Sequence, residues 1–244
     1  MPARETLEKV FFWLLVVTLC GWFAAGWKKG ALPPKEAILP VLFQEPVQTP
    51  TTRKEFKFEY RGVQYRVRPV AEYELWGLVV DHNDINAWWD IYHTADSVDT
   101  LDLGVIWGDN LKIHDYHRVK MWSSSWCINW EFPAGVTFSH AHIANNHLIT
   151  KDPATRRKIA TIRKGDQVRL RGMLCDYQGS NNYEFWRQSS TTRTDTGGTA
   201  CEVVYVDSID VLKTATPGWY LLYTICSWGI AISLLGRIAL MFMA

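Results

Sequence analysis

Two long apolar segments, one near each end of the chain, dominate its hydrophobic pattern. Residues 10–27 read VFFWLLVVTLCGWFAAGW and contain no charged side chain, and residues 218–236 are also uncharged. At about 1.5 Å per residue, helices of this length nearly cross a hydrocarbon layer of ~30 Å. Trp and Tyr stand at their ends, as in interfacial aromatic belts. The pattern predicts two transmembrane helices, with short tails at 1–9 and 237–244.

Each segment has a second interpretation. Basic residues precede the first segment, and Ala24-Ala25-Gly26 within it suits a signal-peptide cleavage site. The second could be a buried C-terminal helix, although it lacks the polar face of a helix at a domain surface. Two spans would place both termini on one side of the membrane. Flanking cations are balanced on the two sides, so the positive-inside rule does not fix the orientation.

The region between the two apolar segments begins with a proline-rich stretch and continues with stretches in which apolar and polar residues alternate. Residues 28–55 hold five prolines in a stretch that favours extended backbone, which predicts a tether. Residues 56–213 then form the expected soluble domain. Segments 56–60 and 63–67 flank Arg61-Gly62, which predicts a two-residue hairpin.

Further strands and two helices are expected within this domain. Residues 121–132 alternate with period two and predict one strand with its tryptophans on one face. Asp152 before Pro153 is a capping signal that predicts a helix over 152–162. Residues 85–95 have a helical apolar face and predict another helix. The predicted class is mainly β with α insertions, as an antiparallel barrel or sandwich.

Two later segments resemble a known fold. KGDQVRLRGMLCDY (164–177) has a Gly-Asp turn followed by a V-x-L-x-G strand, and CEVVYVDSIDVL (201–212) ends in I-x-V-L. Together they resemble the later strands of an OB-fold barrel, although SH3-like barrels use similar turns. The whole layout is similar to bacterial inner-membrane proteins with one Trp-rich soluble domain. The resemblance implies an OB-like barrel and a periplasmic domain, and it implies no activity. The His-x-x-x-Tyr motif of the haem chaperone, another membrane-anchored OB-like domain, is absent from the sequence, so no haem or other cofactor is expected.

Charge adds a candidate binding surface. The formal net charge is only +1, which argues against nucleic acid as a partner of the whole molecule. A local basic stretch could nevertheless join the tryptophans in a groove for a single strand or meet anionic lipid headgroups. A solvated basic face over a Trp-lined core is the favoured interpretation. The residues concerned are Arg156, Arg157, Lys158, Arg163, Lys164, Arg169, Arg171, Trp122, Trp126 and Trp130.

Histidines and cysteines give two further candidates. His140 and His142 would face the same way on a strand and could share a metal ion. The sequence nominates no third or fourth ligand, so surface or hydrogen-bonded histidines are favoured. Cys127 and Cys201 both fall on expected core strands and are the favoured disulfide pair, although the sequence does not fix the connectivity.

These observations favour a membrane-anchored binding or scaffold protein without enzymatic activity. We expect it in a bacterial inner membrane with its domain in the periplasm, and we expect a protein partner or a homo-oligomer. One alternative is a nucleic-acid or nucleotide-binding module that faces the cytoplasm. Another is a metal-dependent envelope enzyme that uses His140 and His142.

Overall fold

The structure is a computed structural model of the 244-residue chain. It describes all residues except 1, 84, 86–93, 95, 114, 125–126, 183–184, 196, 198–199 and 243–244. The chain divides into two compact units, one formed by residues 1–31 and 215–244 and the other by residues 32–214.

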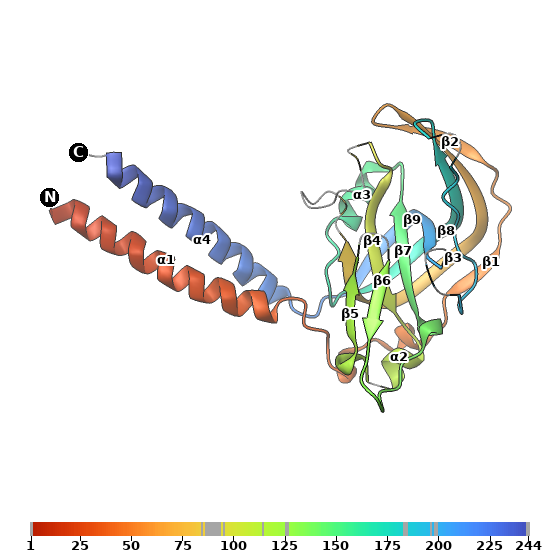
Figure 1. The fold of residues 1–244 in the computed structure, drawn as a ribbon, viewed down its shortest axis with the longest axis horizontal. Helices are drawn as coiled ribbons and strands as arrows, with labels where there is room; N and C mark the ends of the chain where they lie inside the picture. Colours follow the sequence, from red (N-terminus) through yellow and green to blue (C-terminus); the bar gives the residue numbers. More distant parts are fainter. Residues whose placement is uncertain are drawn as a thin grey trace. The chain divides into compact units, whose positions relative to one another are not determined.

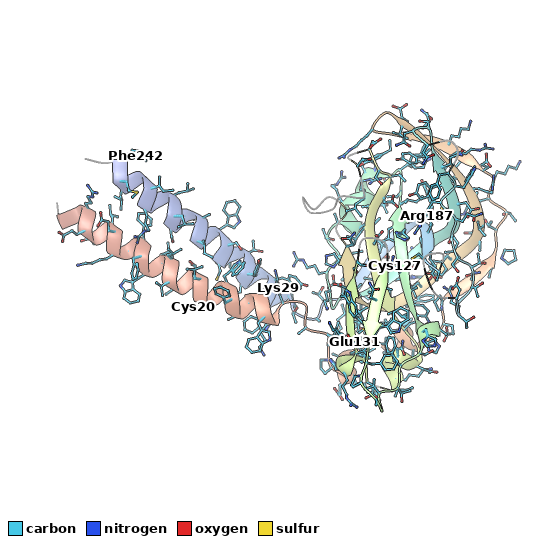
Figure 2. All side chains as sticks on the ribbon, in the orientation of Figure 1. Cys20, Lys29, Cys127, Glu131, Arg187 and Phe242 are labelled. Carbon is cyan, nitrogen blue, oxygen red and sulfur yellow. The ribbon has the colours of Figure 1, made fainter. Side chains whose placement is uncertain are left out.

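The first unit is a pair of helices, α1 (Pro2–Lys28) and α4 (Pro217–Phe242), both long and apolar enough to cross a membrane. Glycines bring the two helices close together. A Cβ on Gly229 would lie 2.4 Å from Thr18, and one on Gly236 would lie 2.4 Å from Phe11. The sticks in Figure 2 show many other side chains projecting away from the pair, as lipid-facing side chains would. Both helices extend beyond the predicted spans, because the expected tails continue them.

The second unit contains a seven-stranded sheet and a separate two-stranded sheet (Figure 1). The strands of the large sheet are β1 (Val47–Pro50), β2 (Phe56–Tyr60), β3 (Val63–Asn83), β4 (Asp99–Ile106), β7 (Ile143–Ile149), β8 (Gln167–Gly179) and β9 (Glu202–Lys213). The small sheet pairs β5 (Lys120–Ser123) with β6 (Ile128–Glu131). The described helical segments of this unit are short: η1 (Lys35–Ala37), η2 (Pro40–Phe43), α2 (Asp109–Lys112), η3 (Asp115–Arg118), η4 (His140–His142) and α3 (Pro153–Ile159). The mainly β class is confirmed.

The long strand β3 organises the large sheet. It pairs with β4 near its C-terminal end and with β8 along most of its length. The pairings therefore run from β3 through β4, β7, β9 and β8 and return to β3. All of them are antiparallel except that between β7 and β9, which is parallel. Consequently β4, β7 and β9 lie side by side and can bring their side chains together.

Two local predictions are confirmed. Arg61 and Gly62 both have positive φ, 49° and 83°, and they join β2 to β3 as the two-residue turn requires. At α3 the Asp152 carboxylate accepts from the backbone N–H of Thr155 at 2.7 Å, with Pro153 at the first helical position.

The predicted tether is wrong, because most of residues 28–55 belongs to the second unit. Leu42 is fully buried, and β1 pairs with β3. The Gln167 side chain also fixes this segment, since it accepts from Leu39 N–H and donates to the Ala37 carbonyl, both at 2.8 Å. The prolines of this segment therefore favour an extended backbone that packs on the second unit rather than a free linker.

The single strand predicted over 121–132 is also wrong. The chain reverses between β5 and β6, and the Ser124 N–H donates to the Cys127 carbonyl at 2.9 Å. A serine run favours such a turn, because short hydroxyl side chains compete for backbone hydrogen bonds. Strand β7 is one that the alternation of the sequence does not predict. All its residues are buried, so it shows no alternation. The helix predicted over 85–95 lies mostly outside the described residues.

Candidate functional site

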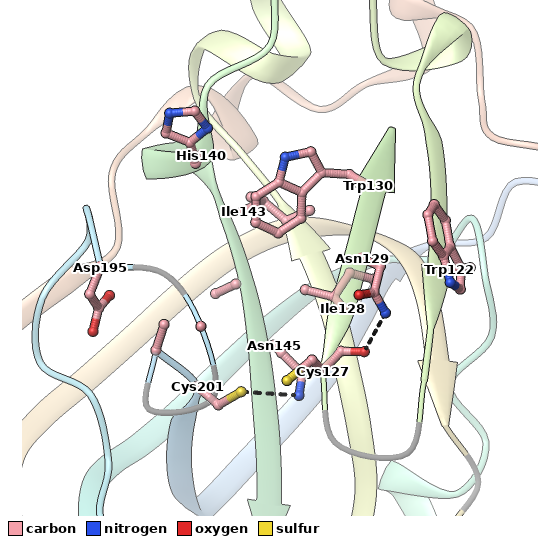
Figure 3. A pocket seen from close by; sticks show the side chains of 13 residues that line it. Trp122, Cys127, Ile128, Asn129, Trp130, His140, Ile143, Asn145, Asp195 and Cys201 are labelled. Atoms are coloured by element: carbon pink, nitrogen blue, oxygen red, sulfur yellow. Dashed lines mark hydrogen bonds between the residues drawn. The ribbon is translucent and has the colours of Figure 1, made fainter. Parts of the chain in front are cut away.

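A pocket of about 400 Å³ opens in the second unit beside β6 and β7 (Figure 3). Four segments that are distant in sequence line it. Its walls are Trp122, Cys127, Ile128, Asn129, Trp130, His140, Ile143, Ala144, Asn145, Asp195, Gly197, Ala200 and Cys201. The structure therefore brings together five of the sequence-predicted residues: Trp122, Trp130, His140, Cys127 and Cys201.

Cys201 lies at the floor of the pocket because of strand register. β7 and β9 run parallel with Asn146 opposite Glu202, which places Cys201 beside Asn145. The Asn145 side-chain N–H donates to Cys201 Sγ at 3.6 Å (Figure 3). Cys201 is 5% exposed, so its thiol is shielded except toward the pocket that it lines.

Below Cys201, a buried carboxylate orients a buried imidazole. Asp102 on β4 is the register partner of His147 on β7, and each is 1% exposed. His147 Nδ1 lies 2.6 Å from Asp102 Oδ1, so an Nδ1–H donates to the carboxylate. This bond leaves Nε2 for chemistry on the side of Cys201, with which the ring shares a further hydrogen bond.

Arg187 completes the network from the connection between β8 and β9. A bridge between Tyr177 and Arg187 holds its backbone against β8. Arg187 Nη2 lies 2.7 Å from His147 Nε2. A guanidinium only donates, so this contact needs an unprotonated Nε2, whereas the Asp102 carboxylate favours a protonated ring. The Arg187 contact and a proton therefore compete for Nε2. Arg187 also puts a fixed positive charge close to the Cys201 sulfur.

The environment shifts the pKa values of these groups in opposite directions. Burial lowers the pKa of His147, but the Asp102 carboxylate raises it more strongly, to about 10. Burial raises the pKa of Cys201, but the hydrogen bond and charge of His147 reverse this effect and leave it below its ordinary value. Burial and the neighbouring Cys201 raise the pKa of Cys127. The site therefore increases the thiolate fraction of Cys201 and decreases that of Cys127.

The predicted Cys127–Cys201 disulfide is not formed in the structure. Each of the five cysteines is a free thiol, including Cys127 and Cys201. The two side chains nevertheless share a hydrogen bond and lie together at the pocket wall (Figure 3).

His140 and His142, the predicted metal-binding pair, have different partners in the structure. His142 Nε2 lies 2.8 Å from Glu45 Oε1, whereas the His140 ring stacks over Trp130 at a centroid distance of 6.5 Å. Among the described residues, no group of three or more His, Cys, Asp or Glu is placed to hold a metal ion.

The basic stretch does not form one surface with the pocket tryptophans. Arg156 turns inward, where its guanidinium donates to the carbonyls of Val98 and Thr150 at 3.0 and 2.8 Å. Lys158 pairs with Asp210, Arg169 with Glu74, and Arg171 donates to Ser208. None of the predicted basic residues, including Arg157, Arg163 and Lys164, is among the described residues that line the pocket. Trp126 lies outside the described residues.

Sequence reasoning missed Asp102, Asn145 and Arg187. One signal was present: the triplet Asn145-Asn146-His147 interrupts an otherwise apolar segment, IANNHLI. Polar side chains in a fully buried strand need buried partners, and these are often functional. Comparison with protein-family models, curated proteins and solved structures found no match for the chain.

Proposed function

We propose that this protein is a two-span protein of a bacterial inner membrane whose periplasmic, OB-like β domain binds an extended segment of a partner polypeptide. The observation that carries the proposal is the pocket between β6 and β7. Consecutive residues of both strands line it, Cys127–Trp130 on one side and Ile143–Asn145 on the other. Such a groove matches the shape of an extended chain.

The open edges of both strands support this choice of ligand. β9 pairs with β7 only from Asn146 onward, so in the described part of the chain Ile143–Asn145 have β4 as their one strand neighbour. Within the same described ranges, β6 pairs with β5 alone. Strand edges of this kind can hydrogen-bond an added strand, while adjoining pockets select its side chains.

The tryptophans supply apolar contact area. Trp122 is 37% exposed, and Trp130 packs against Phe138 and His140 beside the pocket. Buried tryptophans are frequent among the residues that dominate binding energy at protein interfaces.

The strand pairings run from β3 through β4, β7, β9 and β8 back to β3, and this closed series supports an OB-like barrel. Counted from β3, its strands are β3, β4, β7, β8 and β9 in chain order. OB-folds bind ligands on their second and third strands and on the loop between the fourth and fifth. The pocket is lined by β7, the third strand, and by the β8–β9 connection. The periplasmic placement rests on the resemblance of the layout to bacterial inner-membrane proteins.

Site-specific photo-crosslinking in intact cells tests the binding proposal. A photoreactive phenylalanine analogue at position 122 should give a discrete product with a polypeptide, and the same probe at exposed Arg157 should not. The product should disappear when Ala200→Trp fills the pocket. A product of two copies of this chain would identify a homo-oligomer. Equal products at both positions, or none at position 122, would reject the proposal.

The compartment has its own test. A membrane-impermeant thiol reagent should label half-buried Cys127 in cells whose outer membrane alone is permeable. Labelling only after the inner membrane is opened would place the domain in the cytoplasm.

A further inference from the structure

The pocket floor carries chemistry that binding alone does not require. The thiols of Cys127 and Cys201 line the same pocket, and three polar groups surround the Cys201 thiol. Cys201 accepts a hydrogen bond from Asn145, contacts His147 and lies near Arg187. Cys127 stands at the start of β6, is half-buried and lines the same pocket.

We propose that Cys201 and Cys127 form a reversible dithiol–disulfide pair that exchanges with a disulfide or dithiol of the bound polypeptide. The inference rests on the proposed function, because the pocket must admit a polypeptide segment. It assigns Cys201 as the attacking thiol and Cys127 as the resolving thiol. It also makes the disulfide expected from the sequence one that opens and closes.

The roles follow from the surroundings of each sulfur. A thiolate is the nucleophile in exchange, and donors and cations around a sulfur increase its thiolate fraction. Cys201 has such donors, whereas Cys127 has a raised pKa caused by burial and by Cys201 itself. A thiol that stays protonated until its neighbour has reacted is suited to the second step.

The exchange balances without another reactant. Cys201 thiolate attacks one sulfur of the substrate disulfide, the S–S bond breaks, and the leaving sulfur departs as a thiolate. The Cys127 thiol then gives its proton to the first substrate thiolate and attacks Cys201 Sγ, which breaks the mixed disulfide and releases the second substrate thiolate. That thiolate takes the proton that His147 received from Cys201. Two electrons pass to the substrate, which becomes a dithiol, and the protein holds the Cys127–Cys201 disulfide. The reverse sequence oxidises a substrate dithiol.

Asp102, His147 and Arg187 serve this exchange as positioning and proton-holding groups. Asp102 fixes the imidazole through Nδ1, so that Nε2 can receive the Cys201 proton. When Nε2 is protonated, the Arg187 guanidinium must leave it, because two donors repel. The guanidinium then faces the thiolate. The protonated imidazole and the guanidinium thus balance the negative charges of the thiolate and of the Asp102 carboxylate at the pocket floor.

Redox equilibration of the purified full chain in detergent tests the inference, with reduced and oxidised glutathione as the probe. After acid quenching and alkylation, peptide mass spectrometry should find a Cys127–Cys201 disulfide whose fraction rises and falls reversibly with the glutathione ratio. Cys127→Ser should accumulate glutathione on Cys201 at least tenfold above the wild type, because the resolving thiol is missing. Cys175→Ser is the matched control, since Cys175 is fully buried away from this pocket, and it should leave the disulfide fraction unchanged.

Two results would overturn the inference: thiols that stay unlinked at every glutathione ratio, or glutathione that collects on Cys127 rather than on Cys201. Cys127→Ala provides a second resolving-thiol variant in case Cys127→Ser does not fold. The outcome is separable from that of the proposed function. Persistent crosslinks at position 122 with unlinked thiols would end this inference alone. An intact redox couple without crosslinks would end the binding proposal and the exchange with a bound polypeptide, and it would leave the Cys127–Cys201 couple itself standing.

Discussion

The basic stretch around α3 and β8 and the polar floor of the pocket both carry buried or half-buried charges, but they use them differently. In the basic stretch, Arg156 satisfies backbone carbonyls and Arg169 meets a carboxylate across neighbouring strands. Each cation is therefore used locally. In the pocket floor, Asp102, His147 and Arg187 come from three distant segments and act on one sulfur.

Charge density along this sequence is therefore a poor guide to where the polar groups converge. Cations that are adjacent in sequence each meet a separate partner on a neighbouring element, such as Asp210 on β9 for Lys158 and Glu74 on β3 for Arg169. A set of single polar residues, each isolated in an apolar segment, produces shifted pKa values because the sheet register brings them together. Strongly shifted pKa values of groups in a cleft are a feature of functional sites.

The largest expected effect comes from removing the carboxylate of the pocket floor. Asp102→Ala should lower the free energy of unfolding by about 4 kcal/mol, because it leaves a buried imidazole without its partner. It should also slow the alkylation of Cys201 at neutral pH on the order of tenfold, which corresponds to about one pKa unit. Urea unfolding of the full chain in detergent and iodoacetamide labelling with mass spectrometry measure the two effects.

Asp99→Ala is the matched control for that prediction. Asp99 is another buried carboxylate on β4, and it accepts from the hydroxyl of Tyr177 at 2.8 Å. Its removal should cost about 2 kcal/mol, as expected for an unsatisfied buried group. The labelling rate of Cys201 should not change. If both variants slow labelling equally, the slowing reflects general loosening and the contrast between the two regions fails.

The sequence predicts the parts of this molecule that local chemistry decides. The Arg61-Gly62 turn, the Asp152 cap and the two apolar helices follow from residue types at short spacing. The pocket does not, because Asp102, His147 and Cys201 meet only through the β4–β7 and β7–β9 registers. The sequence predicts a Cys127–Cys201 disulfide, whereas the structure has two free thiols beside one pocket. The partners that activate Cys201 are not predicted, since buried strand β7 lacks the alternation that marks half-exposed strands.

A second, smaller effect concerns pH. Burial raises the pKa of Glu202 from 4.5 to about 7, although Arg193 Nη1 lies 2.9 Å from its carboxylate and lowers it. Between these two pH values the folded state binds more protons than the unfolded state, so stability falls as pH rises. The loss should reach about 3 kcal/mol by pH 7, at 1.36 kcal/mol per pKa unit.

Glu202→Gln should remove this slope between pH 4.5 and 7, because the amide does not titrate in that range. Urea unfolding of the full chain in detergent at several pH values gives the comparison. Glu74→Gln is the control, since Glu74 is a half-exposed carboxylate in the basic region. The wild-type slope should persist in Glu74→Gln. A slope that also persists in Glu202→Gln would show that other groups cause it.

The smallest effect is expected in the basic stretch itself. Arg169 Nη2 lies 2.5 Å from Glu74 Oε1, but their side chains are 36% and 26% exposed, so water and salt screen the pair. A double-mutant cycle with Arg169→Ala and Glu74→Ala should give a coupling free energy of about 0.5 kcal/mol. Arg157→Ala, at an exposed position of α3, should change stability even less. A coupling several times larger, or tight salt-dependent oligonucleotide binding that Arg157→Ala and Arg169→Ala both weaken, would make this stretch a functional surface. Because Arg156, Lys158 and Arg169 already have partners within the domain, we expect neither result. The convergence of charge on Cys201 stays the feature that separates the two regions.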